Sequence, residues 1–338
     1  MKKSTIIILL ILGLIAHTLN AQDKKLAQTG MKFLSVSTDA RTSGFSEAVT
    51  AVELASASSI FYNPATMASI KEFTSVTFGN VNWIADINYL HAAIAFAPFD
   101  GNYGVVGVSF QTVDYGEFFG TVVDPSAPNN AGYRDVGTYS PKAYAFGVGY
   151  ARALSTKFSV GGNIKYVKQN LGSSITDIDK TGNTVTEDNA LGALAFDFGI
   201  LYKTGFKSLN FGMSVRNFSK ELKYKKETFQ MPLMFKIGLS MDAMDLLSVD
   251  KNTHSFIVAV DASHPRDFSE QIYVGAEYTF INTFSIRAGF VSPADEYNFS
   301  AGFGVKQNIA GMNLGIDYAY QPYGIFNNVH RFSFNFSF

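Results

Sequence analysis

The chain ends in Arg331–Phe338, which reads RFSFNFSF. Every even position of this stretch is phenylalanine, and every odd position is polar. Because successive side chains of a β-strand point to opposite faces, the pattern predicts a strand with one apolar and one polar face. Such a strand is typical of a wall that separates lipid from an aqueous lumen.

The same alternation recurs from Glu72 onward, for example in Phe158–Tyr166 and Leu209–Arg216. Strands of soluble β-sandwiches also alternate, but they average about five or six residues, whereas these segments are long enough to cross a bilayer at a tilt. The sequence therefore predicts an all-β, transmembrane, antiparallel β-barrel of about 14 strands, an even number as in single-chain barrels. The expected strands are residues 72–83, 86–98, 102–115, 142–154, 157–170, 190–204, 209–221, 232–243, 254–264, 270–281, 284–292, 297–308, 312–321 and 328–338.

The composition agrees with a lipid-facing surface. Aromatic residues make up 14% and charged residues 16% of the chain, and the charged share lies well below the roughly 25% of soluble domains. The formal net charge of -1 offers no clustered basic face for nucleic acid. The absence of cysteine excludes disulfides, thiolate metal sites and cysteine nucleophiles.

The N-terminus has the pattern of a secretory signal peptide. Lys2 and Lys3 precede an apolar run, Ile6–Ala16, and a more polar stretch that ends at Ala21. A membrane anchor would need about 20 apolar residues. We therefore expect a signal peptide in residues 1–21, a plug or hatch in residues 22–70 and the barrel in residues 71–338.

The expected loops alternate in length. The connections at residues 99–101, 155–156, 206–208 and 282–283 are short, whereas those at residues 116–141 and 172–189 are long and polar. Barrels of the bacterial outer membrane have short periplasmic turns and longer outer loops. We therefore expect the outer membrane of a Gram-negative bacterium, with both termini in the periplasm. Phe338 resembles the terminal aromatic signal by which such barrels are recognised for assembly, and Trp83 is expected in an interfacial aromatic belt.

Residues 22–70 lack the alternation of the wall and are rich in small residues between Ala48 and Ser59. A barrel of this size is wider than side chains alone can fill, so this segment is the candidate occupant of the lumen. Asn63 before Pro64 favours a sharp corner, and the Asn63 amide can bond to nearby backbone. The alternative is an ordinary turn that leads into the first strand.

The sequence offers little for catalysis or metal binding. The histidines of the expected mature chain, His91, His254, His264 and His330, are scattered without metal-ligand spacing. There is no G-x-S-x-G elbow, and the acidic residues of the loop at 172–189 lack the spacing of an EF-hand. We expect neither an enzyme nor a cofactor. Expected lumen positions mix acidic and basic side chains, which suits the docking of a plug through ion pairs.

Two short motifs resemble a known superfamily. The run Phe61, Tyr62, Asn63, Pro64 and Ala65 resembles the hatch motif of FadL-type outer-membrane fatty acid transporters, which usually continues with glycine where this chain has threonine.

The second motif lies upstream, where Arg41 and Gly44 belong to a pattern similar to the PorV/PorQ branch of that superfamily. This branch serves the type IX secretion system of Bacteroidota. The resemblance implies an accessory role in type IX secretion or in surface attachment of secreted proteins. Its partners would be outer-membrane lipid and, at the outer loops, a secretion translocon or secreted proteins. The alternatives are FadL-like transport of a hydrophobic small molecule and a purely structural barrel.

Overall fold

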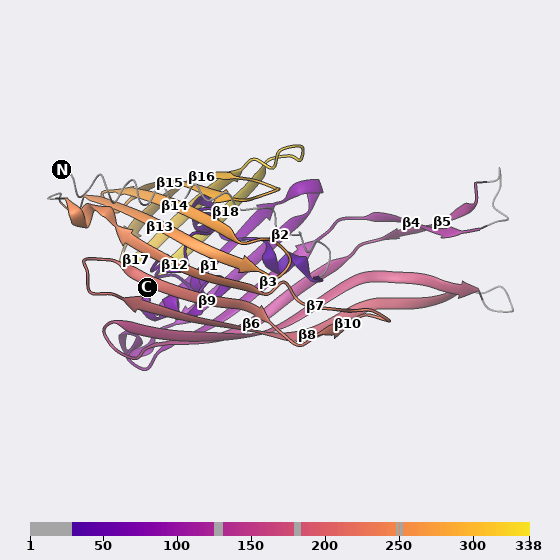
Figure 1. The fold of residues 1–338 in the computed structure, drawn as a ribbon, viewed down its shortest axis with the longest axis horizontal. Helices are drawn as coiled ribbons and strands as arrows, with labels where there is room; N and C mark the ends of the chain where they lie inside the picture. Colours follow the sequence, from indigo (N-terminus) through magenta and orange to yellow (C-terminus); the bar gives the residue numbers. More distant parts are fainter. Residues whose placement is uncertain (1–28, 125–130, 179–183, 248–249, 251–252) are drawn as a thin grey trace.

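The computed structural model describes residues 29–124, 131–178, 184–247, 250 and 253–338. Its fourteen long strands form one closed barrel in which every neighbouring pair is antiparallel (Figure 1). Each of the fourteen segments expected from the sequence overlaps one of these strands, although β7 and β8 extend several residues beyond the expected bounds. They are β1 Thr74–Asn82, β2 Asn88–Phe96, β3 Val105–Asp114, β6 Lys142–Ala153, β7 Phe158–Ile178, β8 Thr184–Lys203, β9 Asn210–Phe218, β12 Met234–Asp242, β13 His254–Pro265, β14 Gln271–Phe280, β15 Phe284–Ser292, β16 Phe299–Ile309, β17 Met312–Gln321 and β18 Val329–Ser337.

The first and last strands close the barrel. Phe78 of β1 lies opposite Phe334 of β18, and their rings stack with centroids 5.2 Å apart. Both rings are exposed on the outside of the wall, whereas Arg331 and Ser333 of β18 are buried inside. The alternation of the last strand therefore separates an apolar outer face from a polar inner face, as the sequence indicates. Within the described residues, no helix is long and apolar enough to cross a membrane.

The two ends of the barrel differ. At one end, β4 Phe118–Val123 and β5 Tyr133–Tyr139 form a separate two-stranded ribbon, and β7 and β8 continue beyond the wall (Figure 1). We call β4 and β5 the ribbon, and this end of the barrel the ribbon end. The short pair β10 Leu222–Lys223 and β11 Thr228–Phe229 follows β9. The opposite end, where β18 finishes, is called the C-terminal end.

The expectation of plain loops at residues 116–141 and 172–189 is wrong for the described part of both. The first contains the ribbon, and most of the second belongs to the extensions of β7 and β8. Most of their described side chains are exposed, because these strands stand outside the wall and have no lumen to face. The alternation that marks a wall strand is therefore missing there.

Residues 29–70, here called the N-terminal segment, lie inside the barrel. They form the short turns η1 Lys32–Ser35, α2 Ala40–Gly44, η2 Ala57–Phe61 and η3 Pro64–Ser69. Side chains cap three of these turns: Asp39 accepts from the Thr42 amide, Ser56 from the Ser58 amide and Asn63 from the Ala65 amide. The turn α2 contacts β15 to β18, η2 contacts β1 to β3, and η3 contacts β3 and β6 to β8. Since these strands surround the lumen, the segment occupies its interior.

Candidate functional site: the N-terminal segment in the lumen

The N-terminal segment begins at the ribbon end. Thr29 pairs with Gln230 in a parallel bridge, and the Gly30 amide donates to the Gln230 carbonyl at 3.0 Å. Asp267, in the turn between β13 and β14, accepts from the Thr29 hydroxyl at 2.6 Å and forms an ion pair with Lys32. Burial alone would raise the pKa of the Asp267 carboxyl, but these two donors hold it below its ordinary value.

The first described residue therefore lies at the end opposite to Phe338. The sequence predicts that both termini lie on one side of the membrane. Residues 1–28 fall outside the described part of the chain, so the position of the N-terminus and the signal peptide stay predictions.

A layer of buried apolar side chains, here called the apolar layer, lies in the lumen next to the start of the N-terminal segment. Met31, Phe33 and Leu34 are buried among side chains that come from opposite sides of the wall. Because water is excluded from such a layer, these side chains are the candidate barrier between the ribbon end and the rest of the lumen. Its other buried members are Val81, Tyr89, Val113, Ala143, Ala145, Val167, Ala193, Ala195, Leu222, Met231, Tyr323 and Val329.

Between Ala40 and Ser59 the segment carries only three charged residues, Arg41, Glu47 and Glu53, and each forms an ion pair with the wall. Arg41 forms two hydrogen bonds to Glu277, with Nε at 3.0 Å and Nη2 at 2.7 Å from its carboxylate. Glu53 pairs with Lys203 at 2.6 Å. These pairs support the expectation that lumen charges dock the segment.

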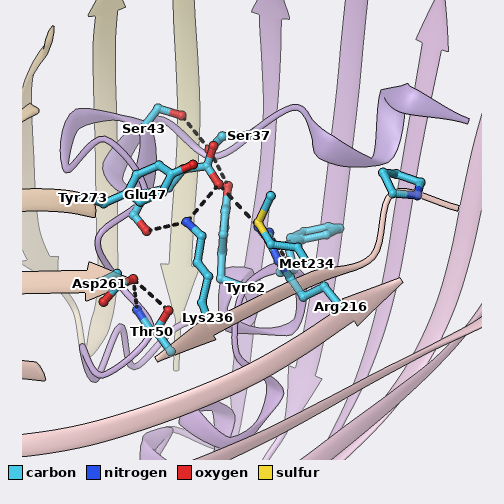
Figure 2. Close-up of polar contacts among 12 residues, drawn as sticks. Ser37, Ser43, Glu47, Thr50, Tyr62, Arg216, Met234, Lys236, Asp261 and Tyr273 are labelled. Atoms are coloured by element: carbon cyan, nitrogen blue, oxygen red, sulfur yellow. Dashed lines mark hydrogen bonds and ion pairs between the residues drawn. The ribbon is translucent and has the colours of Figure 1, made fainter. Parts of the chain in front are cut away.

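Glu47 is the most buried of the three, since its side chain is 9% exposed, against 25% for Arg41 and 31% for Glu53. Figure 2 shows the surroundings of its carboxylate. Its carboxylate lies 3.5 Å from Arg216 Nη2 and 3.7 Å from Lys236 Nζ. Lys236 also donates to the Glu47 carbonyl at 3.2 Å and lies 3.8 Å from the centre of the Tyr273 ring. A lone buried charge would be costly, so both cations and the carboxylate depend on one another.

The wall also bonds to uncharged groups of the segment. Asp261 accepts from the Thr50 amide at 3.0 Å and from its hydroxyl at 2.7 Å (Figure 2). The Tyr62 hydroxyl accepts from the Asp39 amide at 3.0 Å and shares a hydrogen bond with Ser37. Tyr62 therefore ties the second half of the segment to the first.

Of the residues singled out in the sequence, Asn63 makes three side-chain hydrogen bonds, all to backbone groups. Its Nδ2 donates to the Thr50 carbonyl at 2.7 Å and to the Ile200 carbonyl of β8 at 3.1 Å, while its Oδ1 accepts from the Ala65 amide at 3.1 Å. The corner thus lies against β7 and β8 inside the lumen, rather than only leading into β1. This geometry accounts for asparagine here, since one amide supplies both donor and acceptor.

The other singled-out residues are placed as follows. Phe61 packs edge-on against His91, with ring centroids 5.8 Å apart. Gly44 lies against Arg287 and Gly302. Phe338 pairs with Thr74 at the C-terminal end, and its side chain is exposed. Trp83 does not join an outer belt, because it packs against Tyr323 and the buried Arg331 guanidinium.

Glycines of the wall let the segment approach the strands closely. A Cβ on Gly161 would lie 2.5 Å from the Pro64 carbonyl carbon, and a Cβ on Gly212 would lie 2.2 Å from the Thr50 carbonyl oxygen. Real Cβ contacts are not this short, so the backbone of the segment occupies space that side chains would otherwise fill. The other wall glycines whose Cβ would come closer than 3.0 Å to an atom of the segment are Gly107, Gly199, Gly275 and Gly289.

A cavity of about 650 Å³ remains between the segment and β13 to β18. We call it the polar chamber, because most of its lining side chains are charged or carry hydroxyl or amide groups. Arg41, Glu277, Arg287 and Asp317 form a connected set of ion pairs along it. It reaches the C-terminal end at the turns around Asn282 and Asn308. Among the described residues, no group of His, Asp and Glu is arranged to hold a metal ion.

The ion pairs of Glu47 and Glu53 with the wall are contacts that the sequence did not reveal. The available signal was the isolation of three charges in a run of small residues, but their partners lie on strands far away in the chain.

Comparison with known proteins gives one family and a set of similar folds. The model of the family described as type IX secretion system membrane protein PorP/SprF matches residues 133–338, more than half of the chain. No curated protein matches the chain.

Among solved structures, the CymD monoaromatic hydrocarbon channel has a TM-score of 0.57 at 12% identity over 90% of this chain and 98% of that chain. A Pseudomonas aeruginosa FadL homologue has a TM-score of 0.55 at 11% identity over 89% and 98%, respectively. The Pseudomonas putida toluene transporter TodX has a TM-score of 0.50 at 10% identity over 82% and 91%. At these identities the likeness shows the fold alone, and it confirms the FadL-like barrel expected from the sequence.

Proposed function

Since the chain belongs to the PorP/SprF family of type IX secretion system membrane proteins, we propose that it is an outer-membrane accessory of that system that contacts secretion partners through its ribbon end. The expected link to type IX secretion is confirmed by the family. The narrower assignment to the PorV/PorQ branch remains a proposal that rests on the two motifs of the N-terminal segment.

The observation that carries this proposal is the shape of the ribbon end. The ribbon and the extensions of β7 and β8 stand beyond the wall (Figure 1), and the ribbon exposes Phe119 at 88% and Val123 at 83%. An isolated two-stranded ribbon is marginally stable in water, and its open edges invite pairing with another chain. These features favour a protein partner at this end.

The test uses two variants of the ribbon in living cells. We expect the double substitution Phe119→Ser with Val123→Ser to reduce export of type IX cargo while the barrel still assembles and keeps its heat-modifiable mobility on gels. The control Thr138→Ala removes an exposed polar side chain from the same ribbon and is expected to leave export unchanged. Normal export in the double variant would contradict the proposal.

We also propose that the N-terminal segment acts as a plug, that the C-terminal end faces the periplasm and that the ribbon end faces the outside. The support for this orientation is the difference in length between the connections at the two ends. The chain has no cysteine, so single cysteines report exposure without background. A maleimide that cannot cross membranes is expected to label Thr138→Cys in intact cells, and Asn102→Cys only after lysis. The reverse result would invert the orientation.

Transport of a hydrophobic small molecule is the second candidate, and the fold shared with CymD and TodX favours it. Two features weigh against it: the apolar layer that includes Phe33 is a candidate barrier at one end of the lumen, and the polar chamber has the wrong lining for such a ligand. Faster toluene uptake into cells that carry the protein than into cells that lack it would favour this candidate over the first.

A further inference from the structure

The polar chamber has the size of a ligand site and opens at the C-terminal end. Its volume of about 650 Å³ falls within the roughly 300–1,000 Å³ of typical ligand pockets. Its walls come from β13 to β18 on one side and from the N-terminal segment, including Ser56 and Ser58, on the other. The apolar layer lies at the opposite end of the lumen, so a ligand would enter from the C-terminal end.

The charged side chains of the chamber differ in what they offer to a ligand. The formal charges balance: Arg41, Arg287 and Lys306 are basic, and Asp39, Glu277 and Asp317 are acidic. The acidic side chains are covered, since Asp39 is 1% exposed and the side chains of Glu277 and Asp317 are 2% and 9% exposed. The Arg41 side chain is 25% exposed, and Lys306 is exposed at the mouth. The accessible charge in the chamber is therefore positive.

Both accessible cations keep hydrogen-bond donors for a ligand. An arginine side chain has five N–H groups, and Arg41 uses one on Nε and one on Nη2 for Glu277 and one on Nη1 for the Leu54 carbonyl. One N–H on each terminal nitrogen remains. Lys306 lies two residues beyond Gly304 on the inward face of β16, and its ammonium makes no hydrogen bond or ion pair within the described part of the chain.

The acidic side chains of the chamber are not available to a ligand, because their oxygens are already hydrogen-bonded or buried. Both oxygens of Glu277 accept from arginine, Asp317 accepts from Arg287 and from Asn335, and the Asp39 oxygen Oδ1 accepts from Thr42. The remaining Asp39 oxygen is buried below the surface of the chamber. Around the two cations, hydroxyl and amide side chains such as Thr279, Ser285 and Asn313 supply neutral polar contacts.

We propose that the polar chamber binds a small anionic, hydrophilic ligand whose carboxylate or phosphate group reaches Arg41 and Lys306. The same chemistry occurs in free anions and at the carboxylate terminus of a peptide. This proposal does not rest on the partner surface at the ribbon end. The binding test of the chamber and the export test of the ribbon can therefore succeed or fail separately.

The test measures binding to the purified full chain in lipid nanodiscs by calorimetry. The probes are inorganic phosphate, citrate and the tetrapeptide Ser-Thr-Asn-Glu. We expect at least one probe to bind and Lys306→Gln to weaken it by about tenfold, the effect of losing one charge-assisted hydrogen bond. Arg41→Gln should weaken it further, but this variant also removes an ion pair of the fold, so Lys306→Gln is decisive.

The matched control is Lys157→Gln, which removes an exposed lysine from a turn at the same end of the barrel that does not line the chamber. It is expected to leave the affinity unchanged. Binding of phosphate or citrate alone would identify a free anion as the occupant, and binding of the peptide would identify a chain terminus; either result supports the proposal. The proposal is overturned if no probe binds, if Lys306→Gln binds as the wild type does, or if Lys157→Gln loses as much affinity.

Discussion

The side-chain oxygen of Asn63 occupies the space that a Cβ on Gly199 would need. The two positions would lie only 1.9 Å apart. The Asn63 amide is held there by the Thr50 carbonyl, the Ile200 carbonyl and the Ala65 amide, so it cannot swing away without losing buried hydrogen bonds. At this point the N-terminal segment and the wall are fitted to each other.

We expect Gly199→Ala to destabilise the protein by about 1–3 kcal/mol, the usual cost of overpacking a well-packed interior. The measurement is urea unfolding in lipid vesicles. Gly162→Ala is the matched control on the neighbouring strand β7, because a Cβ there would meet its nearest atom at an ordinary 3.5 Å. Equal stability of the two variants would show that the close approach at Gly199 is not rigid.

Asn63→Asp is expected to lower stability by at least about 1–3 kcal/mol, because a carboxylate cannot donate to the Thr50 and Ile200 carbonyls. Asn102→Asp makes the same chemical change in an exposed turn at the C-terminal end and is expected to have little effect. Urea unfolding in vesicles measures both variants. If Asn63→Asp unfolds like the wild type, the corner does not depend on the two donors.

Glu277→Gln is expected to be the most damaging of the charge-removing variants. It leaves Arg287, whose side chain is buried, without one of its two carboxylate partners, and it also releases Arg41. Removing one partner of a buried ion pair typically costs about 3–5 kcal/mol. The control is Glu187→Gln, which breaks an exposed pair with Lys225 worth no more than about 1 kcal/mol. A similar unfolding midpoint for both variants would contradict this expectation.

Phe33→Ala is expected to open a leak through the apolar layer. Phe33 is fully enclosed in that layer, and truncating a buried phenylalanine leaves a cavity at a cost of about 3–5 kcal/mol. We expect a rise in ion conductance across planar bilayers relative to the wild type. Phe119→Ala, at the exposed ribbon, should not change the current. If folded Phe33→Ala protein shows no rise in ion conductance, the barrier to ions lies elsewhere in the lumen.

The stability that the contacts of Asp267 with Thr29 and Lys32 contribute is expected to depend on pH. The pKa of this carboxyl is lower in the folded protein than its ordinary value of 3.8, so its stabilising contribution is full above that value and is lost as the pH falls through the folded value. Because Lys32 is about half exposed, the contribution is below about 1 kcal/mol. The protection factors of residues 30–36 in hydrogen exchange, which are corrected for the intrinsic pH dependence of amide exchange, should fall at low pH in the wild type and show no such step in Asp267→Asn.

The wall of the barrel could be predicted from the sequence because each of its strands faces lipid on one side and the lumen on the other. Because the two sides differ in polarity, apolar and polar residues alternate along the wall strands, as Phe332 and Ser333 do in β18. The sequence did not predict the ribbon or the extensions of β7 and β8. These strands lie beyond the wall, so they do not have lipid on one face and the lumen on the other. Trp83 was misplaced for a related reason, since the sequence does not say that Arg331 offers its ring an inward partner.

The candidate site could be predicted only in outline. The sequence indicates that the residues before the first strand differ from the wall and that charges face the lumen. It does not indicate that Glu47 meets Arg216 and Lys236, because these contacts form only when β9 and β12 take their places in the closed barrel. Some glycines of the wall, such as Gly161, Gly199 and Gly212, are explained only by their contacts with the N-terminal segment, which lies far away in the chain.

The close contacts between the wall glycines and the N-terminal segment restrict how the sequence can diverge. A larger residue at Gly199 is compatible with the fold only if position 63 becomes smaller, and a larger residue at Gly212 only if the backbone at Thr50 moves away. The two parts of the chain are therefore expected to change together among its relatives, with paired substitutions at 63 and 199. A relative that loses the segment should regain side chains along the inner wall.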